Sequence, residues 1–147
     1  MGVIIREARV SDIPEIAALE ELCFSLPWTA QALREQIQSD SHVFLVAERD
    51  GVLAGYAGLQ YVLDEGYITN VAAAPAFRRQ GIASAIMTEM LLWAKKLELA
   101  FLTLEVRESN SHARRLYEKH GFREVGKRRS YYENPVEDAM LMTVYLK

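Results

Sequence analysis

Glu105 and Tyr117 are the side chains of this 147-residue sequence that are best suited to move protons. Glu105 interrupts an otherwise apolar run at residues 101–106, and a carboxylate partly shielded from water there is a candidate general base. The same position would also suit an ordinary strand-end acid paired with Arg107 or a neighbour. Tyr117 lies on the apolar side of a short predicted helix, where a tyrosine is usually a core residue, although its phenol could act as an acid. Position alone leaves both alternatives open for each residue.

A basic loop that contains a glycine is a candidate phosphate-binding site. Arg78, Arg79, Gln80 and Gly81 stand between an apolar strand and a long helix that begins at Ile82. The first N–H groups of a helix lack intrahelical partners and the helix dipole adds positive charge, so an anion is stabilised there by ~0.3–2 kcal/mol. An ordinary strand-to-helix turn with solvated arginines fits the same residues equally well.

Other motifs in the chain give weaker signals. Asn110 suits a helix cap, and His42, His112 and His120 do not have the spacing of metal ligands, so no metal site is predicted. The basic loop lacks the Gly-Lys-Ser/Thr ending of a P-loop and the three glycines of a dinucleotide fingerprint. The sequence therefore does not support nucleotide hydrolysis or hydride transfer.

Length and composition predict one globular domain over residues 1–147. Hydrophobic residues make up 50% and charged residues 25%, and the net charge is −3, so a broad footprint for nucleic acid is not expected. The single cysteine, Cys23, excludes an internal disulfide framework and favours a core role in a reducing cytoplasm. No signal peptide is expected, and no apolar stretch approaches the ~20 residues that span a bilayer.

Hydrophobic periodicity predicts an α/β (α+β) fold in which about seven strands form a mixed, mostly antiparallel sheet flanked by about four helices. The strands are expected at residues 3–8, 43–48, 52–62, 67–74, 101–106, 122–128 and 139–145. Helices are expected after Asp12, after Thr29, at 82–97 and at 110–120, and the 67–106 passage implies a right-handed parallel crossover. The first helix is expected to bury Ile13, Ile16, Leu19, Leu22 and Cys23.

The stretch from Arg78 to Ala83 resembles the Arg/Gln-x-x-Gly-x-Gly/Ala signature of the Gcn5-related N-acetyltransferase (GNAT) superfamily, and the predicted strand order agrees with that fold. The closer resemblance is to its RimI branch, which acetylates the N-terminal alanine of a small-subunit ribosomal protein. It covers nearly the whole chain and rests on Phe24, Pro27, Trp28, Leu104, Glu105, Val106, Arg107, Ser109, Asn110, Ala113, Leu116, Tyr117, Gly121, Phe122, Tyr131, Tyr132, Asp138 and Ala139.

The resemblance implies a role for each matching residue. Glu105 matches the family's proton acceptor and Tyr117 its proton donor to the departing thiolate. The positions that match the binding site for acetyl-CoA are Val71, Ala72, Ala73, Arg78, Arg79, Gln80, Gly81, Ile82, Ala83, Ser84 and Asn110. Ala83 stands where many relatives have a second glycine, which is a tolerated departure.

The implied activity is direct transfer of an acetyl group from acetyl-CoA to an acceptor amine in a ternary complex. The expected acceptor is a protein N-terminus, and that of a small-subunit ribosomal protein is favoured. A lysine side chain, a polyamine or another small amine stays open as the acceptor. A non-catalytic acyl-CoA-binding module is a further alternative, against which the presence of both Glu105 and Tyr117 argues.

Overall fold

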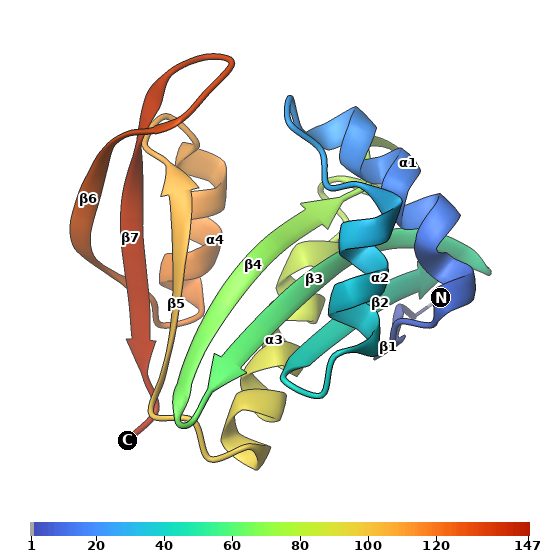
Figure 1. The fold of residues 1–147 in the computed structure, drawn as a ribbon, viewed down its shortest axis with the longest axis horizontal. Helices are drawn as coiled ribbons and strands as arrows, with labels where there is room; N and C mark the ends of the chain where they lie inside the picture. The colour runs from blue at the N-terminus through green and yellow to red at the C-terminus, as the bar shows by residue number, and fades with distance from the viewer. Residues whose placement is uncertain (1) are drawn as a thin grey trace.

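One mixed seven-stranded sheet organises residues 2–147, which are the residues described in the computed structural model (Figure 1). Its order is β1-β2-β3-β4-β5-β7-β6, and β4 and β5 form its parallel pair. The strands are β1 (Ile4–Glu7), β2 (His42–Arg49), β3 (Val52–Val62), β4 (Glu65–Ala73), β5 (Phe101–Arg107), β6 (Arg123–Tyr132) and β7 (Glu137–Tyr145). The helices are α1 (Ile13–Cys23), α2 (Ala30–Gln38), α3 (Ile82–Lys96) and α4 (Ser111–Lys119). The predicted fold class is confirmed.

Apolar side chains that alternate along the strands build one core on each face of the sheet. In β2, Leu45 packs toward α3 and α4, whereas Phe44 packs toward α1 and α2. Figure 1 shows α1 and α2 in front of β3 and β4, with α3 behind them. Among the described residues, no helix covers the front face of β5, β7 and β6 (Figure 1). Within residues 2–147, no helix is long and apolar enough to cross a membrane.

Local sequence signals explain where several elements begin and end. Asp50 and Gly51 connect β2 to β3 with φ of 54° and 76°, as a tight two-residue hairpin turn requires. The Thr29 hydroxyl accepts a hydrogen bond from the Ala32 amide and caps α2 at 3.1 Å. Gly121, with φ of 95°, follows the end of α4. These features confirm the expected turn and helix ends.

The buried stripe of α1 differs from the prediction at one position. Leu22 is 69% exposed, and Glu20 takes the buried position instead with no exposed surface. Positions 13, 16, 20 and 23 share one face of a helix, and Leu22 lies about 100° away from Cys23. The Glu20 carboxylate is tolerated there because it accepts hydrogen bonds from the Trp28 amide at 2.7 Å and from the Tyr56 hydroxyl.

The last two strands are longer than the predicted ranges 122–128 and 139–145. Pairing between β6 and β7 continues as far as Tyr132 and Glu137, beyond a register shift that follows Arg128. The loop between these strands is tied to the end of β5, because Arg107 donates hydrogen bonds to the carbonyl oxygens of Glu133 and Pro135 at 2.9 Å each. This long-range contact has no signature in the local sequence.

The parallel strands β4 and β5 are paired only at their first residues. The pairing runs from Glu65 with Phe101 to Tyr67 with Thr103, and the strands then diverge toward the top of Figure 1. In β4 a bulge at Thr69 shifts the register with β3, where Gly58 faces the bulge. The divergence opens the sheet beside Glu105.

Candidate active site

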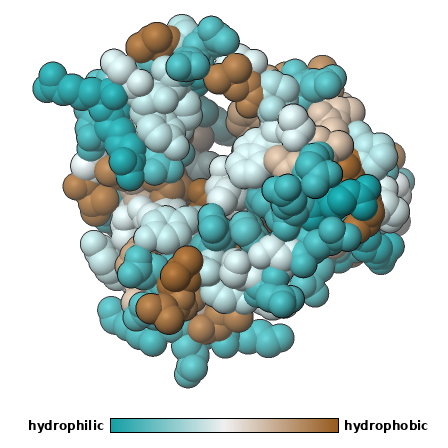
Figure 2. Space-filling view, in the orientation of Figure 1, coloured by the Kyte–Doolittle hydropathy of each residue, from teal (hydrophilic) through white to brown (hydrophobic). Residues whose placement is uncertain are grey.

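A cavity of about 890 Å³ fills the opening between the diverging strands. Glu20 and Trp28 line it from the α1 and α2 side, Tyr117 from the α4 side, and Val71 and Glu105 from the two strands. It therefore reaches both faces of the sheet through the gap. Figure 2 shows a hollow between the two halves of the molecule, near the top of the view.

Glu105 lies at the wall of this cavity with part of its side chain exposed. Its carboxylate faces the Arg128 guanidinium of β6, with an Nε–Oε1 distance of 3.3 Å. Its partner is therefore a neighbour from another strand and not Arg107, which binds the β6–β7 loop and Glu137, the latter at 3.3 Å. An ion pair with an exposed arginine is screened by water and contributes little free energy, so an incoming amine can take the place of Arg128.

Tyr117 is 7% exposed and its ring packs against Phe122, with 5.9 Å between the ring centroids. Burial raises the pKa of Tyr117 to about 12, so the phenol stays protonated at neutral pH. No residue in the described part of the chain hydrogen-bonds to its hydroxyl, which faces the cavity. A buried core tyrosine normally finds such a partner, so this hydroxyl is left free to donate a hydrogen bond to a ligand in the cavity.

Of the predicted cofactor residues, Val71 and Asn110 line the cavity together with Glu105 and Tyr117. The Asn110 side chain accepts a hydrogen bond from the Ala113 amide at 3.1 Å, so it also caps α4. Ala72 is buried on the α1 and α2 side, and the carbonyl oxygen of Ala73 lies 3.8 Å from the Cys23 sulfur. The contribution of these two alanines to a ligand would come from the backbone.

The basic loop lies beyond the end of β4, outside the lining of the cavity. Arg79 has φ of 66° and Gly81 has φ of 77°, and such left-handed residues near a helix start form concave clusters of N–H groups. Nothing lies within 4 Å of the space where a Gly81 side chain would begin. Open space, arginines and free helix amides fit a phosphate group at this end of α3.

The remaining loop residues divide between backbone and side-chain roles. Arg78 and Gln80 are exposed, whereas Ile82 is 2% exposed and packs in the core, so only its backbone can face a ligand. Ala83 is half-buried in the first turn of α3. The Ser84 hydroxyl lies 3.0 Å from Nε2 of His120, which ties the start of α3 to the end of α4.

Sequence reasoning missed Glu20, because a glutamate in an apolar helix suggests a solvent-facing position. The structure places its carboxylate at the cavity, where it holds the Trp28 amide and lies 3.5 Å from the Asn70 side-chain nitrogen. Glu20 thus connects the α1–α2 loop to the bulged part of β4. Within residues 2–147, no group of three or more histidine, cysteine, aspartate or glutamate side chains is placed to hold a metal ion.

Comparison with known proteins identifies the family of this chain. A model of the Acetyltransferase (GNAT) family matches residues 13–122. A protein of Bacillus subtilis is 36% identical over 141 residues, which cover 95% of this chain and 93% of its own. The ribosomal protein bS18-alanine N-acetyltransferase of Escherichia coli is 32% identical over 142 residues, which cover 95% of each chain.

Solved structures give the same result. The crystal structure of the ribosomal-protein-S18-alanine N-acetyltransferase from Escherichia coli matches with a TM-score of 0.92 and 31% identity, over 99% of this chain and 95% of that chain. The family model, the two relatives and the solved structure therefore all indicate the same family. The chain belongs to the GNAT family of acetyltransferases, whose acetyl donor is acetyl-CoA.

Proposed function

We propose that this protein transfers the acetyl group of acetyl-CoA to the α-amino group of an N-terminal alanine in a small-subunit ribosomal protein. The observation that carries the chemistry is the convergence of Glu105 and Tyr117 on one cavity from two different elements. The acceptor follows from relatives of Escherichia coli and Haemophilus influenzae, both named ribosomal protein bS18-alanine N-acetyltransferase, at 32% and 34% identity. A cytoplasmic location is part of the proposal, because that is where ribosomal proteins are made.

The donor would be held by two parts of the chain. The exposed loop from Arg78 to Gly81 and the first amides of α3, up to Ser84, would bind the pyrophosphate. Backbone groups at Val71, Ala72 and Ala73 would orient the acetyl end, because these residues stay paired with β3 but lie beyond the last pairing of β4 with β5. When bound, acetyl-CoA supplies an activated thioester. An N–H group of β4 directed at the thioester oxygen would stabilise the charge that develops there.

The acceptor amine has to lose a proton before it can attack. An α-amino group has an unperturbed pKa of about 8 and is mostly protonated at neutral pH. Glu105 accepts that proton, directly or through a water molecule, after the amine displaces Arg128. Tyr117, which burial keeps protonated, donates its proton to the leaving sulfur on the other side of the gap.

The acceptor's first residue would enter between two loops that line the cavity. Phe24 and Trp28 come from the α1–α2 connection, and Tyr131 and Tyr132 come from the end of β6. Glu20 fixes the first loop through the Trp28 amide, whereas Arg107 fixes the second. Two anchored loops around a narrow mouth suit the terminus of an extended chain.

The experiment compares peptides that begin with alanine, serine or methionine and follows thiol release from acetyl-CoA. The alanine peptide is expected to react fastest. With saturating alanine peptide, Glu105→Gln should lower kcat by about 10²–10⁴-fold and change the pH profile. An unchanged rate and pH profile in Glu105→Gln would show that another group takes the proton.

A further inference from the structure

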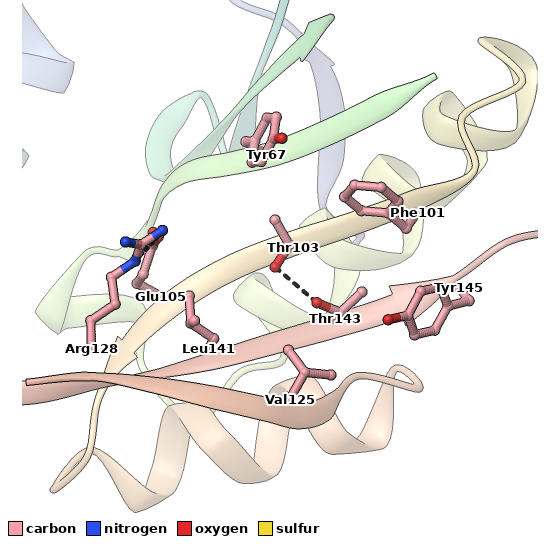
Figure 3. Close-up of a pocket in the computed structure, with 9 residues that line it drawn as sticks. All are labelled: Tyr67, Phe101, Thr103, Glu105, Val125, Arg128, Leu141, Thr143 and Tyr145. Atoms are coloured by element: carbon pink, nitrogen blue, oxygen red, sulfur yellow. Dashed lines mark hydrogen bonds and ion pairs between the residues drawn. The ribbon is translucent and has the colours of Figure 1, made fainter. Parts of the chain in front are cut away.

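A second cavity of about 360 Å³ lies on the uncovered face of β4, β5, β7 and β6 (Figure 3). We call it the β5–β7 groove and define it by Tyr67, Phe101, Thr103, Val125, Leu141 and Tyr145. One end is formed by the Glu105–Arg128 pair, and Glu105 also lines the larger cavity. The groove is therefore continuous with the site of proton transfer.

The groove is lined by rings and apolar side chains. The Phe101 ring lies between Tyr67 and Tyr145, with centroid distances of 6.3 and 6.4 Å. Figure 3 shows Val125 and Leu141 from the neighbouring strands on the same side. These exposed apolar groups form a patch with one charged end, and such patches on otherwise polar surfaces mark interaction sites.

The threonine hydroxyls and the Tyr67 hydroxyl of the groove are already paired within the protein. The hydroxyls of Thr103 and Thr143 lie 2.9 Å apart, and Thr103 donates to the carbonyl oxygen of Met142 at 3.1 Å. The Tyr67 hydroxyl donates to Glu65 at 2.6 Å at the rim. The groove therefore offers contact area to apolar or aromatic side chains and leaves few unpaired polar groups for a polar ligand to bind.

Its length matches a short stretch of extended chain. Phe101 and Glu105 lie on the same side of β5, four residues apart, which corresponds to about 13 Å along a strand. If the terminal amine of an extended chain lies at Glu105, its third residue lies at about Thr103 and its fifth residue at about Phe101. In an extended chain these alternate side chains point to the same side.

We infer that the β5–β7 groove binds the acceptor polypeptide beyond its N-terminal residue and selects apolar or aromatic side chains near its third and fifth positions. The inference rests on the proposed function and names a substrate subsite for it. Acceptor recognition then has two parts: the loops around Trp28 and Tyr131 hold the first residue, and the open sheet face holds the following ones.

The test uses three acceptors with acetyl-CoA: the dipeptide Ala-Arg amide, the hexapeptide Ala-Arg-Phe-Gly-Phe-Gly, and the same hexapeptide with glycine in place of both phenylalanines. In the wild type, kcat/KM for the phenylalanine hexapeptide should exceed that of the other two about tenfold, which is about 1.4 kcal/mol. The double variant Val125→Ser with Tyr145→Ala should lose this preference and retain its activity on the dipeptide. Both side chains are more than half exposed, so the fold should persist.

The matched control is Val52→Ser, at an exposed valine of β3 outside both cavities, which should keep the hexapeptide preference. Equal kcat/KM for all three peptides in the wild type would refute the groove and leave the proposed function standing. No acetylation of any peptide would refute the proposed function itself. A wild-type dimer that the double variant converts to a monomer would assign this face to a second copy of the chain and overturn the inference.

Discussion

Replacing Tyr117 with phenylalanine separates a catalytic tyrosine from a structural one. The substitution removes one hydroxyl and keeps the ring that packs on Phe122. That hydroxyl faces the cavity and has no hydrogen-bond partner in the described part of the chain. Folding should therefore be almost unaffected, while the step that needs its proton should slow down.

The size of both effects follows from the local contacts. Loss of a positioned proton donor costs about 10²–10⁴-fold in kcat, or roughly 2.7–5.5 kcal/mol of transition-state stabilisation. The free energy of unfolding should stay within about 0.5 kcal/mol of the wild type, because no protein hydrogen bond is broken. Affinity for acetyl-CoA should be retained.

Tyr56→Phe is a control with the same chemical change and the opposite expected result. The Tyr56 hydroxyl donates to the buried carboxylate of Glu20, so its removal leaves that carboxylate short of a donor. The expected loss in the free energy of unfolding is about 1–3 kcal/mol. Chemical denaturation gives both stabilities, and thiol release at saturating substrates gives both values of kcat.

A hydrogen-bonded core tyrosine would behave differently: Tyr117→Phe would retain kcat within about threefold and lose more than about 1 kcal/mol in the free energy of unfolding. That result would refute the role of Tyr117 as the proton donor. In the wild type, the pKa of about 12 also predicts that ionisation of this phenol does not shape the rate profile below pH 10.

Three further predictions concern stability. Asp12→Asn should cost about 1–3 kcal/mol in chemical denaturation, because its carboxylate binds Arg6 through two hydrogen bonds; a change under 0.5 kcal/mol contradicts this. Burial lowers the pKa of both His42 and His120 below 6.5. As the pH falls, the unfolded chain therefore binds protons before the folded chain does, and the free energy of unfolding should decrease from pH 7.5 to pH 5.5. Replacing both histidines with asparagine should flatten that slope. Gly55→Ala puts a methyl group 2.7 Å from a carbonyl oxygen of β4 and should lower the melting temperature and weaken acetyl-CoA binding, which calorimetry measures.

The order of elements could be predicted because each signal is local. Alternating apolar residues identify β2 as a strand with two buried faces, and Asp50 with Gly51 identifies the turn after it. Gly55 and Gly58 of β3 both lie next to shifts in strand register. Such features depend on residues a few positions apart, so the sequence displays them directly.

The contacts that shape the site are not local, and the sequence does not display them. Glu20 is buried because its hydrogen-bond partners, Trp28, Tyr56 and Asn70, come from three different parts of the chain. Hydrophobic periodicity therefore selected Leu22 in its place. The partner of Glu105 is another case, since Arg128 reaches it from β6, which is not the adjacent strand in the sheet.

The candidate site could be proposed from its residue types, but its geometry could not. The residue types at Glu105, Tyr117 and the basic loop indicate proton transfer and phosphate binding. Their convergence depends on the divergence of β4 from β5, which follows from pairing that stops after Tyr67 and Thr103. The β5–β7 groove is likewise open because no helix of residues 2–147 covers that face.

The most direct test of the proposed function uses one peptide that has both a free N-terminal alanine and an internal lysine. The peptide is incubated with the protein and acetyl-CoA, and tandem mass spectrometry locates the added acetyl group. We predict a single acetyl group on the α-nitrogen of the alanine, formed by the wild type and lost in Glu105→Gln. Acetylation of the lysine in place of the N-terminus would contradict the account.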